Sequence, residues 1–231
     1  MAAATPNFST FFQGWLSRQE EFLRQLETLL SPVDGFDRSR QCGDIIPRVI
    51  AHYREFYREK AAAVEEDVFL SISPPWMTAF ERSLLWLSGF RPSILFPIIG
   101  ASVAEELSPG QRKRIEEVKA ESRRREKEIT QAMARLQETV AEQPVYGLIK
   151  KFGNSVDGEA PELHAAMEEL KAAMRAAVGN ADALQGWTMS EVVEVLTPVQ
   201  GVKFLAAVAR FQLRARRWGM ERERVAADDT N

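Results

Sequence analysis

Few residues of this chain are suited to catalysis or metal binding. Cys42 is the single cysteine, and His52 and His164 are the two histidines. A nucleophilic cysteine needs a neighbouring base and a lowered pKa, whereas the polar Gln-Cys-Gly stretch around Cys42 indicates an ordinary loop cysteine. His52 is followed by Glu55, and His164 by Glu168, at helical spacing. Because neither histidine has further ligands at matching turns, we interpret His52 as a packed histidine and His164 as half of a surface pair.

Motifs of the common enzyme classes are missing as well. The sequence contains no Gly-rich phosphate loop, no G-x-S-x-G elbow and no H-E-x-x-H zinc motif. Its carboxylates do not form the Glu-x-x-His repeats of di-iron bundles. We therefore expect a protein that is not an enzyme, with no catalytic residue and no metal ligand.

The composition indicates what kind of fold holds these residues. The 231 residues are 45% hydrophobic and 27% charged, which suits one large globular domain or two small ones. A formal net charge of −3 provides no global attraction to DNA, and one cysteine excludes an intramolecular disulfide.

The sequence also predicts that the chain does not cross a membrane. The longest uncharged runs, Val68–Phe80 and Pro92–Ala104, hold thirteen residues each, whereas a spanning helix needs about 20. Met1–Asn7 has no signal-peptide pattern. We expect an intracellular protein in a reducing compartment.

Apolar residues recur at three- and four-residue spacing along most of the chain, as in amphipathic helices. Capping-box spacing predicts helix starts at Ser108–Gln111, Thr188–Glu191 and Thr197–Gln200. The expected fold is all-α, a single-domain bundle of about seven or eight helices over residues 7–224, with a disordered tail at 225–231. The expected helices cover residues 8–30, 45–64, 76–87, 92–107, 111–142 and 163–178 and continue from 188 and from 198, with a long loop over 144–161.

Two stretches concentrate charge. Arg112–Glu128 interleaves basic and acidic residues, which is typical of a solvated helix face with i,i+4 pairs. Arg210–Arg224 is mainly basic and carries Phe211, Leu213 and Trp218. Such a basic amphipathic segment could bind an acidic partner, calmodulin or a phosphate-bearing surface, or form a solvated terminal helix. Its candidate partner-binding residues are Arg214 and Arg217.

Aromatic residues cluster in the middle of the sequence. The spacing suggests two helices joined by a tight turn at Gly89, with Trp76 and Trp86 flanking one apolar face. Arg91 could cap carbonyl groups or hold an anion. The candidates for a ligand pocket are Trp76, Trp86, Phe90, Arg91 and Ser93, although a packed core explains them equally well.

In order and spacing, these features resemble the Delay-of-Germination domain, the plant seed-dormancy-control domain that also follows the zipper of TGA-type basic-leucine-zipper factors. The resemblance covers nearly the whole chain. It is carried by Trp15 and Gln19, the Trp-x-x-Gly-Phe-Arg-Pro-Ser block at Trp86–Ser93, Leu107, Gln111, Ala166-Met167, Ala181-Asp182-x-Leu184, Thr188, Leu196-Thr197-Pro198-x-Gln200, Phe204-Leu205 and Trp218-Gly219.

The resemblance implies a non-enzymatic, α-helical plant regulator. Free-standing members bind and restrain type 2C protein phosphatases in seed dormancy and abscisic-acid signalling, and we expect the chain in the nucleus and cytoplasm. No basic region and heptad zipper precede Phe8, so we expect no sequence-specific DNA binding of that kind. A transcription-factor partner and a homodimer are left open.

The chain departs from the family pattern in two places. Phosphatase binding involves an Asp-Ser-Tyr segment ahead of the first tryptophan, where this chain has Thr10-Phe11-Phe12. Haem binding is attributed to histidines of the final helix, where this chain has Gln212 and Arg216, so we do not predict haem. A fatty-acid pocket, seen with the TGA branch, is left open near Phe90.

The leading hypothesis is a regulator that docks a partner through an apolar helix face with a charged rim. We expect Phe8, Phe11, Phe12 and Trp15 to contribute to that surface, because their density exceeds one buried stripe. The alternatives are a transcriptional co-regulator working with a DNA-binding partner through Arg210–Arg224, and a fatty-acid or small-ligand sensor.

Overall fold

The protein is built from α-helices. The computed structural model describes residues 4–31, 38–141 and 161–228, and within them there are eight α-helices and no strand. Five helices are long: α1 (Ala4–Leu30), α2 (Arg38–Glu66), α6 (Pro109–Ala141), α8 (Pro161–Val195) and α9 (Pro198–Asp228). Three are short: α3 (Val68–Ile72), α4 (Ala79–Ser83) and α5 (Leu95–Ser102), with 3-10 turns at Pro92–Ile94 and Ala104–Glu106. The all-α prediction, including one long charged helix, is confirmed.

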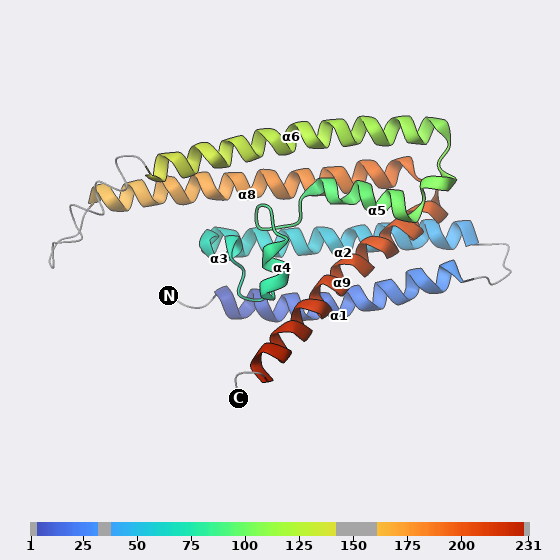
Figure 1. The fold of residues 1–231 in the computed structure, drawn as a ribbon, viewed down its shortest axis with the longest axis horizontal. Helices are drawn as coiled ribbons and strands as arrows, with labels where there is room; N and C mark the ends of the chain where they lie inside the picture. The colour runs from blue at the N-terminus through green and yellow to red at the C-terminus, as the bar shows by residue number, and fades with distance from the viewer. Residues whose placement is uncertain (1–3, 32–37, 142–160, 229–231) are drawn as a thin grey trace.

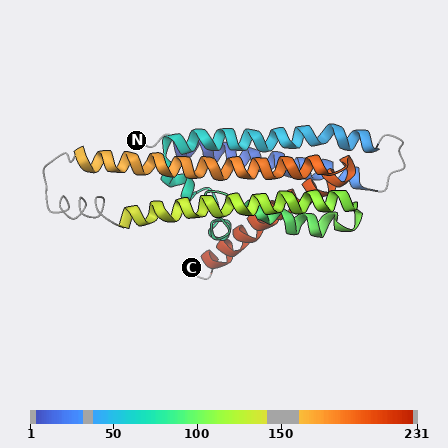
Figure 2. The ribbon, with the colours of Figure 1, turned by 90° about the horizontal axis from the view of Figure 1, so that it is seen from above.

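The long helices form two antiparallel pairs that are crossed by the last helix. α1 lies beside α2 and α6 beside α8, and α9 crosses α1 and α2 diagonally (Figures 1 and 2). The short helices α4 and α5 lie on the same side of the molecule as α9 (Figure 1). None of the described helices has the length and apolar character that a bilayer span requires.

The core is centred on the first half of α9. Val202, Phe204 and Leu205 are fully buried, and they belong to one cluster with Leu26 of α1 and Val49 of α2. A helix that crosses two others at its own apolar face removes much hydrophobic surface from water, which is the main stabilising contribution to such a fold.

Two of the predicted helix starts are confirmed and are joined to each other. The Ser108 and Gln111 side chains each bond the other residue's backbone N–H at the start of α6, and Thr197 and Gln200 do the same at α9. Gln111 Nε2 also donates to Gln200 Oε1 (2.8 Å). The N-termini of α6 and α9 are therefore held together by their capping residues.

Other sequence predictions are corrected by the structure. Thr188 lies inside α8, where its hydroxyl donates to Leu184 O (2.8 Å), so the segment does not begin a helix there. Cys42 is buried in α2 rather than in a loop. Between residues 76 and 87 only α4 is helical, because Thr78 and Glu81 form a capping box that starts the helix there.

The expected ends of the domain also need adjustment. α9 continues to Asp228, so the first residues of the tail expected at 225–231 are helical. The loop expected over 144–161 lies outside the described residues except for its last position, which opens α8.

Candidate functional site

The N-terminal aromatic residues form an internal cluster. Phe8, Phe12 and Trp15 are 5%, 3% and 4% exposed. Phe8 packs on Trp76, with ring centroids 4.7 Å apart, and Trp15 stacks on His52 at 4.6 Å. The expectation that these residues present a docking face is therefore wrong for all three. They fill the junction between α1, α2 and the segment before α4.

Phe11 is the exception among the four aromatic candidates. It is half-buried and has the Arg18 guanidinium 5.8 Å from its ring centroid. Its ring lies 5.7 Å from that of Phe8 and packs at the edge of the core, so that part of the side chain stays accessible. Phe11 alone of the four stays a candidate for partner contact.

The histidine and cysteine considered first are both buried. Burial, with a smaller contribution from the Arg18 charge, lowers the pKa of His52 to about 4, and its Nε2 has no hydrogen-bond partner. Burial raises the pKa of the Cys42 thiol. A neutral histidine and a protonated thiol favour packing over chemistry. No group of three metal-binding side chains occurs in the described part of the chain.

A small group of buried polar residues ties α2 to α8. Lys60 Nζ lies 2.6 Å from Asp182 Oδ1, with side chains that are 4% and 13% exposed. One turn away, Tyr57 donates to Gln185 Oε1 (2.7 Å). Burial lowers the pKa of Lys60 and raises that of Asp182. Paired charges at this depth fix which residues of the two helices face each other.

The Trp86–Ser93 block is a tight turn held between α6 and α8. Trp86 N donates to Gly89 O (2.9 Å), and Ser88 takes a positive φ of 57°. A Cβ at Gly89 would lie 2.5 Å from Gln185 Nε2, which itself donates to Phe90 O. The turn predicted at Gly89 is present, and a side chain at this position would have to displace the Gln185 amide.

The five ligand-pocket candidates do not line one site. Trp76 is buried in the core, where it contacts Phe8. Phe90 and Arg91 line a pocket of about 160 Å³ between α2, α5, α8 and α9. Ser93 and Arg91 lie on a separate hollow against α6, where Trp86 donates to Thr130 Oγ1 (3.1 Å).

Most basic residues of α9 are already paired. Arg210 binds Glu27 (2.7 Å), Arg216 binds the buried Glu81 (3.0 Å), and Arg224 binds Glu221 (2.8 Å). The predicted partner-binding residues Arg214 and Arg217 are exposed, and no described residue forms an ion pair with either. Arg222 also has no ion pair with a described residue, but its guanidinium lies 4.8 Å from the centroid of the Trp218 ring. Arg214 and Arg217 are thus the two cations of the basic stretch Arg210–Arg224 that have neither contact.

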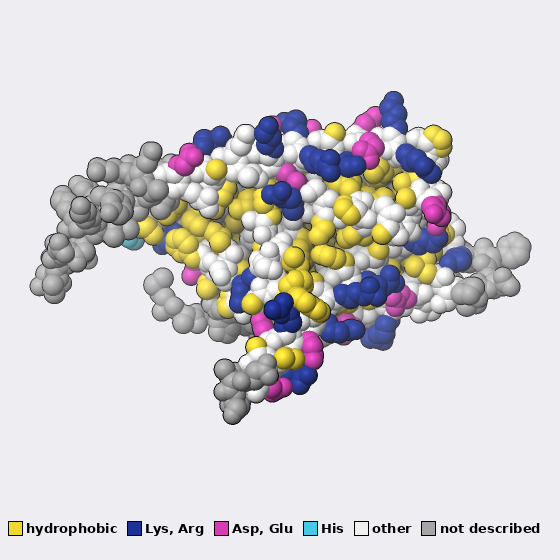
Figure 3. Space-filling view, viewed as in Figure 1, with side chains coloured by type: hydrophobic (Ala, Val, Ile, Leu, Met, Phe, Trp, Pro, Cys, Tyr) yellow, Lys and Arg dark blue, Asp and Glu magenta, His cyan; other side chains and the backbone are white. Residues whose placement is uncertain are grey.

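Arg214 and Arg217 border an open apolar groove. The groove has a volume of about 1140 Å³ and is formed by α4, α5 and α9. Hydrophobic side chains gather in the middle of this face of the molecule, with Lys and Arg side chains around them (Figure 3). Its main apolar residues are Phe80, Leu84, Ile98, Phe211 and Trp218. We define these residues, with Arg214 and Arg217, as the α9 groove.

Trp218 is the most prominent side chain of the α9 groove. It is 48% exposed although its ring packs edge-on against Phe80 at 4.1 Å. Sequence reasoning missed Phe80, Leu84 and Ile98, because each is a routine member of a local apolar pattern. Only the crossing of α9 over α4 and α5 brings them together.

The final helix does not fit haem. The two positions that carry histidines in the family pattern hold Gln212 and Arg216. Gln212 Oε1 accepts hydrogen bonds from Gln19 (2.8 Å) and Tyr53 (2.8 Å), and Arg216 donates to Trp76 O (2.8 Å). Neither side chain offers an imidazole donor, and both are engaged within the protein.

Comparison with known proteins identifies the family of this chain. The family model described as seed dormancy control matches residues 22–101. The Arabidopsis thaliana protein RESPONSE TO ABA AND SALT 1 is 36% identical, over 95% of this chain and 98% of its own length. The chain belongs to the seed dormancy control family. Protein ZW2 of the same organism is 32% identical over 95% of this chain and 99% of its own length.

Transcription factors of the TGA group share this seed dormancy control region. The Arabidopsis thaliana transcription factor TGA5 is 33% identical over 90% of this chain, and the aligned region is 62% of TGA5. The resemblance drawn from the sequence is therefore confirmed for both branches. The Trp86–Ser93 block lies inside the segment that the family model matches.

Proposed function

We propose that this chain is a non-enzymatic plant regulator that acts by binding a protein partner at the α9 groove. The family and its relatives place the chain among plant regulatory proteins of dormancy and of ABA and salt response. Within that setting the proposed partner is a type 2C protein phosphatase, and the proposed compartments are the nucleus and cytoplasm.

The single observation that carries the proposal is the α9 groove itself. A continuous apolar floor is rimmed by Arg214 and Arg217, which no described side chain neutralises. Exposed apolar surface beside unpaired charge is typical of interfaces, where aromatic residues and arginine supply most of the binding energy. The unpaired arginines favour a partner segment with acidic residues beside its apolar anchors.

The N-terminal stretch in which this chain differs from the family pattern bears on where a partner would bind. Thr10-Phe11-Phe12 lies on α1 in the place of the family's Asp-Ser-Tyr segment, and of its two aromatic residues Phe12 is 3% exposed whereas Phe11 is half-buried. We therefore place the main contact at α9 and leave Phe11 as a secondary one.

Binding of the full chain to a purified type 2C phosphatase of plant ABA signalling tests the proposal. Trp218→Ala and the double substitution Arg214→Glu with Arg217→Glu should each weaken binding about tenfold or more. The matched control is Arg40→Glu with Lys113→Glu, which changes the charge equally at exposed positions outside the groove. Groove variants that fold and bind as tightly as this control would contradict the proposal.

A second candidate is a transcriptional co-regulator that works with a DNA-binding partner. The alignment with TGA5 over 90% of this chain favours it, since that transcription factor carries the same region. Three of the six arginines of α9 are paired within the protein, so any DNA contact of the chain alone should be weak and independent of DNA sequence. A gel shift that selects one DNA sequence at moderate salt would contradict this.

A third candidate, a small-ligand sensor, has support from the pocket beside Phe90 and Phe211. Its volume of about 160 Å³ is below the roughly 300–1,000 Å³ of typical ligand sites. We therefore propose at most a short apolar group there, or one end of a fatty acid. Native mass spectrometry of the purified chain should show the bound mass, and a bare polypeptide mass counts against a resident ligand.

A further inference from the structure

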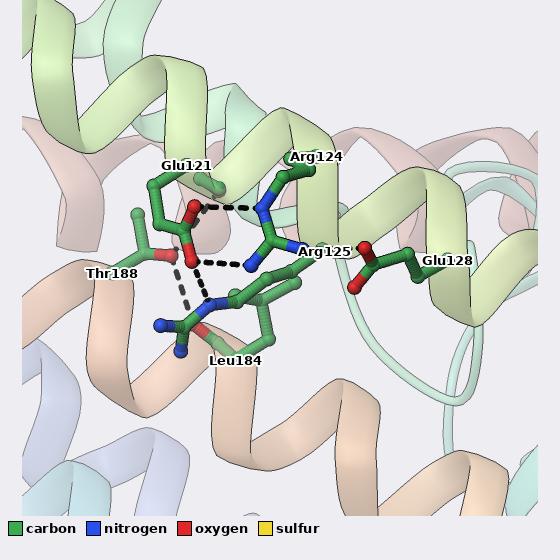
Figure 4. A network of polar contacts seen from close by, with 7 residues as sticks. Glu121, Arg124, Arg125, Glu128, Leu184 and Thr188 are labelled. Carbon is green, nitrogen blue, oxygen red and sulfur yellow. Dashed lines mark hydrogen bonds and ion pairs between the residues drawn. The ribbon is translucent and has the colours of Figure 1, made fainter.

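Most acidic side chains of α6 are matched by basic side chains of the same helix. Glu121 accepts hydrogen bonds from Arg124 (2.7 Å) and Arg125 (2.6 Å), and Glu128 also binds Arg124 (Figure 4). Two further pairs join residues three apart, Glu116 with Lys119 and Arg114 with Glu117. These acidic residues are thus engaged by neighbours at the spacing expected for a solvated helix.

Arg123 and Lys127 are among the basic residues of α6 that stand outside these pairs. Arg123 and Lys127 are exposed, and within the described part of the chain neither forms an ion pair. They are four residues apart, so their side chains share one face of the helix. Although basic and acidic residues alternate along α6, the face that carries Arg123 and Lys127 has a local excess of positive charge.

The Trp86–Ser93 turn supplies a third cation to the same face. Arg91 is exposed, and its guanidinium lies 5.4 Å from the centroid of the Trp86 ring. Trp86 is itself tied to α6, because its Nε1 donates to Thr130 Oγ1. No described carboxylate forms an ion pair with Arg91. The turn thus holds this arginine against the part of α6 that carries Arg123 and Lys127.

The three cations line one open hollow of about 630 Å³, which we define as the α6 hollow. The hydroxyl groups of Ser93 and Thr130 line it as well and offer uncharged donors. Guanidinium, ammonium and hydroxyl groups around one concavity are the donors that proteins use to bind phosphate.

One carboxylate, Glu126, also lines the α6 hollow, and it has a separate role. Glu126 is 6% exposed, and its Oε1 accepts a hydrogen bond from Ser93 N (2.6 Å). It forms no ion pair with the three cations within the described residues. Glu126 therefore anchors the turn to α6, and three cations against one carboxylate leave two formal positive charges.

We propose that the α6 hollow binds a phosphate monoester, carried by a phosphorylated serine or threonine side chain of a protein. Such a group bears a charge of about −1.5 to −2 near neutral pH, which matches the excess charge of the hollow. Small-molecule sites usually enclose most of their ligand, whereas this hollow is open at the surface. An open site suits a charged group that a larger molecule presents.

The test is a titration of the full chain, followed by amide resonances, with an acetylated and amidated Gly-Gly-phosphoserine-Gly-Gly peptide. The amide resonances of Arg91, Ser93 and residues 123–131 should shift and saturate. Inorganic phosphate should compete, and the unphosphorylated peptide should have no effect. Arg123→Gln with Lys127→Gln should weaken binding about tenfold. The matched control, Arg40→Gln with Lys113→Gln, should bind like the unmodified chain.

Glu126→Gln gives a prediction of opposite sign. The amide oxygen can still accept the hydrogen bond from Ser93 N, while one negative charge leaves the hollow, so phosphopeptide binding should tighten. Equal weakening by the control pair, no saturable shift with the phosphopeptide, or saturable binding of inorganic phosphate while the phosphopeptide does not bind would each overturn the proposal. Groove variants at Arg214 and Arg217 should bind the phosphopeptide normally, so failure of the proposed function and failure of this proposal are distinguishable.

Discussion

A lysine and an aspartate are buried together where α2 meets α8. The Lys60–Asp182 pair is separated by 2.6 Å, and Lys60 is 3% exposed. The attraction within a buried ion pair offsets the desolvation of its two charges only while both partners remain. Loss of one partner therefore destabilises the protein far more than loss of both. The pair is consequently a sensitive point of the α2–α8 contact.

Lys60→Met should lower the free energy of unfolding by about 3–5 kcal/mol, because Asp182 is then buried without a partner. Urea denaturation measures this. The double variant Lys60→Met with Asp182→Leu should recover a large part of the loss. The control Arg58→Met, in an exposed pair with Glu59, should stay within about 0.5 kcal/mol of the unmodified chain. A double variant less stable than Lys60→Met would refute this account.

The buried His52 should make stability depend on pH. Its pKa is lowered to about 4, while the unfolded chain has the ordinary value of 6.5. Below pH 6.5 the unfolded state alone gains a proton, so stability falls with pH until the folded state is protonated near pH 4. The total loss should be about 3 kcal/mol.

His52→Phe removes this titration and keeps an aromatic ring beside Trp15. Denaturation curves at pH values between 7 and 4 should show the variant losing about 3 kcal/mol less stability than the unmodified chain. Both proteins contain the same carboxylates, so the contribution of these groups drops out of the difference between the two stability profiles. Parallel pH profiles would show that His52 is accessible to protons in the folded state.

At the scale of the elements, α9 lies close against the start of α4 at Gly219. A Cβ added at Gly219 would lie 2.1 Å from Thr78 Oγ1, the capping atom of α4. Beside this contact, Arg216 reaches Glu81 and Trp76 O. Gly219 thus allows α9 to approach closely enough for α4 to form one wall of the α9 groove.

Gly219→Ala should destabilise the protein by about 1–3 kcal/mol, because Thr78 must move and the capping box is disturbed. The control Gly179→Ala lies in α8 with nothing within 4 Å of the added Cβ, so it should stabilise by up to about 1 kcal/mol through helix propensity alone. Thermal unfolding of both variants checks the sign. A Gly219→Ala protein as stable as Gly179→Ala would show that the α4–α9 contact is loose.

The elements also show which sequence patterns can be trusted. The capping boxes at Ser108 and Thr197 were predictable because their signal is local. The same spacing at Thr188 misled, since a threonine inside a helix can bond the preceding turn instead. The Thr78–Glu81 box carries the same signal and marks the true start of α4. A spacing rule cannot tell a helix start from a helix interior without the packing around it.

At the scale of the whole molecule, the candidate site is a product of tertiary arrangement. Arg214 and Arg217 could be chosen from the sequence because unpaired charge is conspicuous in a basic segment. Phe80 and Ile98 could not, since they become neighbours of Trp218 only where α9 crosses α4 and α5. For the same reason the aromatic surplus at Phe8–Trp15 suggested a surface, whereas α2 and Trp76 cover it.

The central claim, that a partner docks at the α9 groove, is tested most directly by hydrogen–deuterium exchange of the full chain with and without a bound type 2C phosphatase. The account predicts slower exchange in residues 79–84, 95–102 and 206–218, and at most a smaller change in residues 8–15, where Phe11 is a secondary contact. A stable complex that protects residues 8–15, or another surface, while the groove exchanges as in the free chain would contradict it.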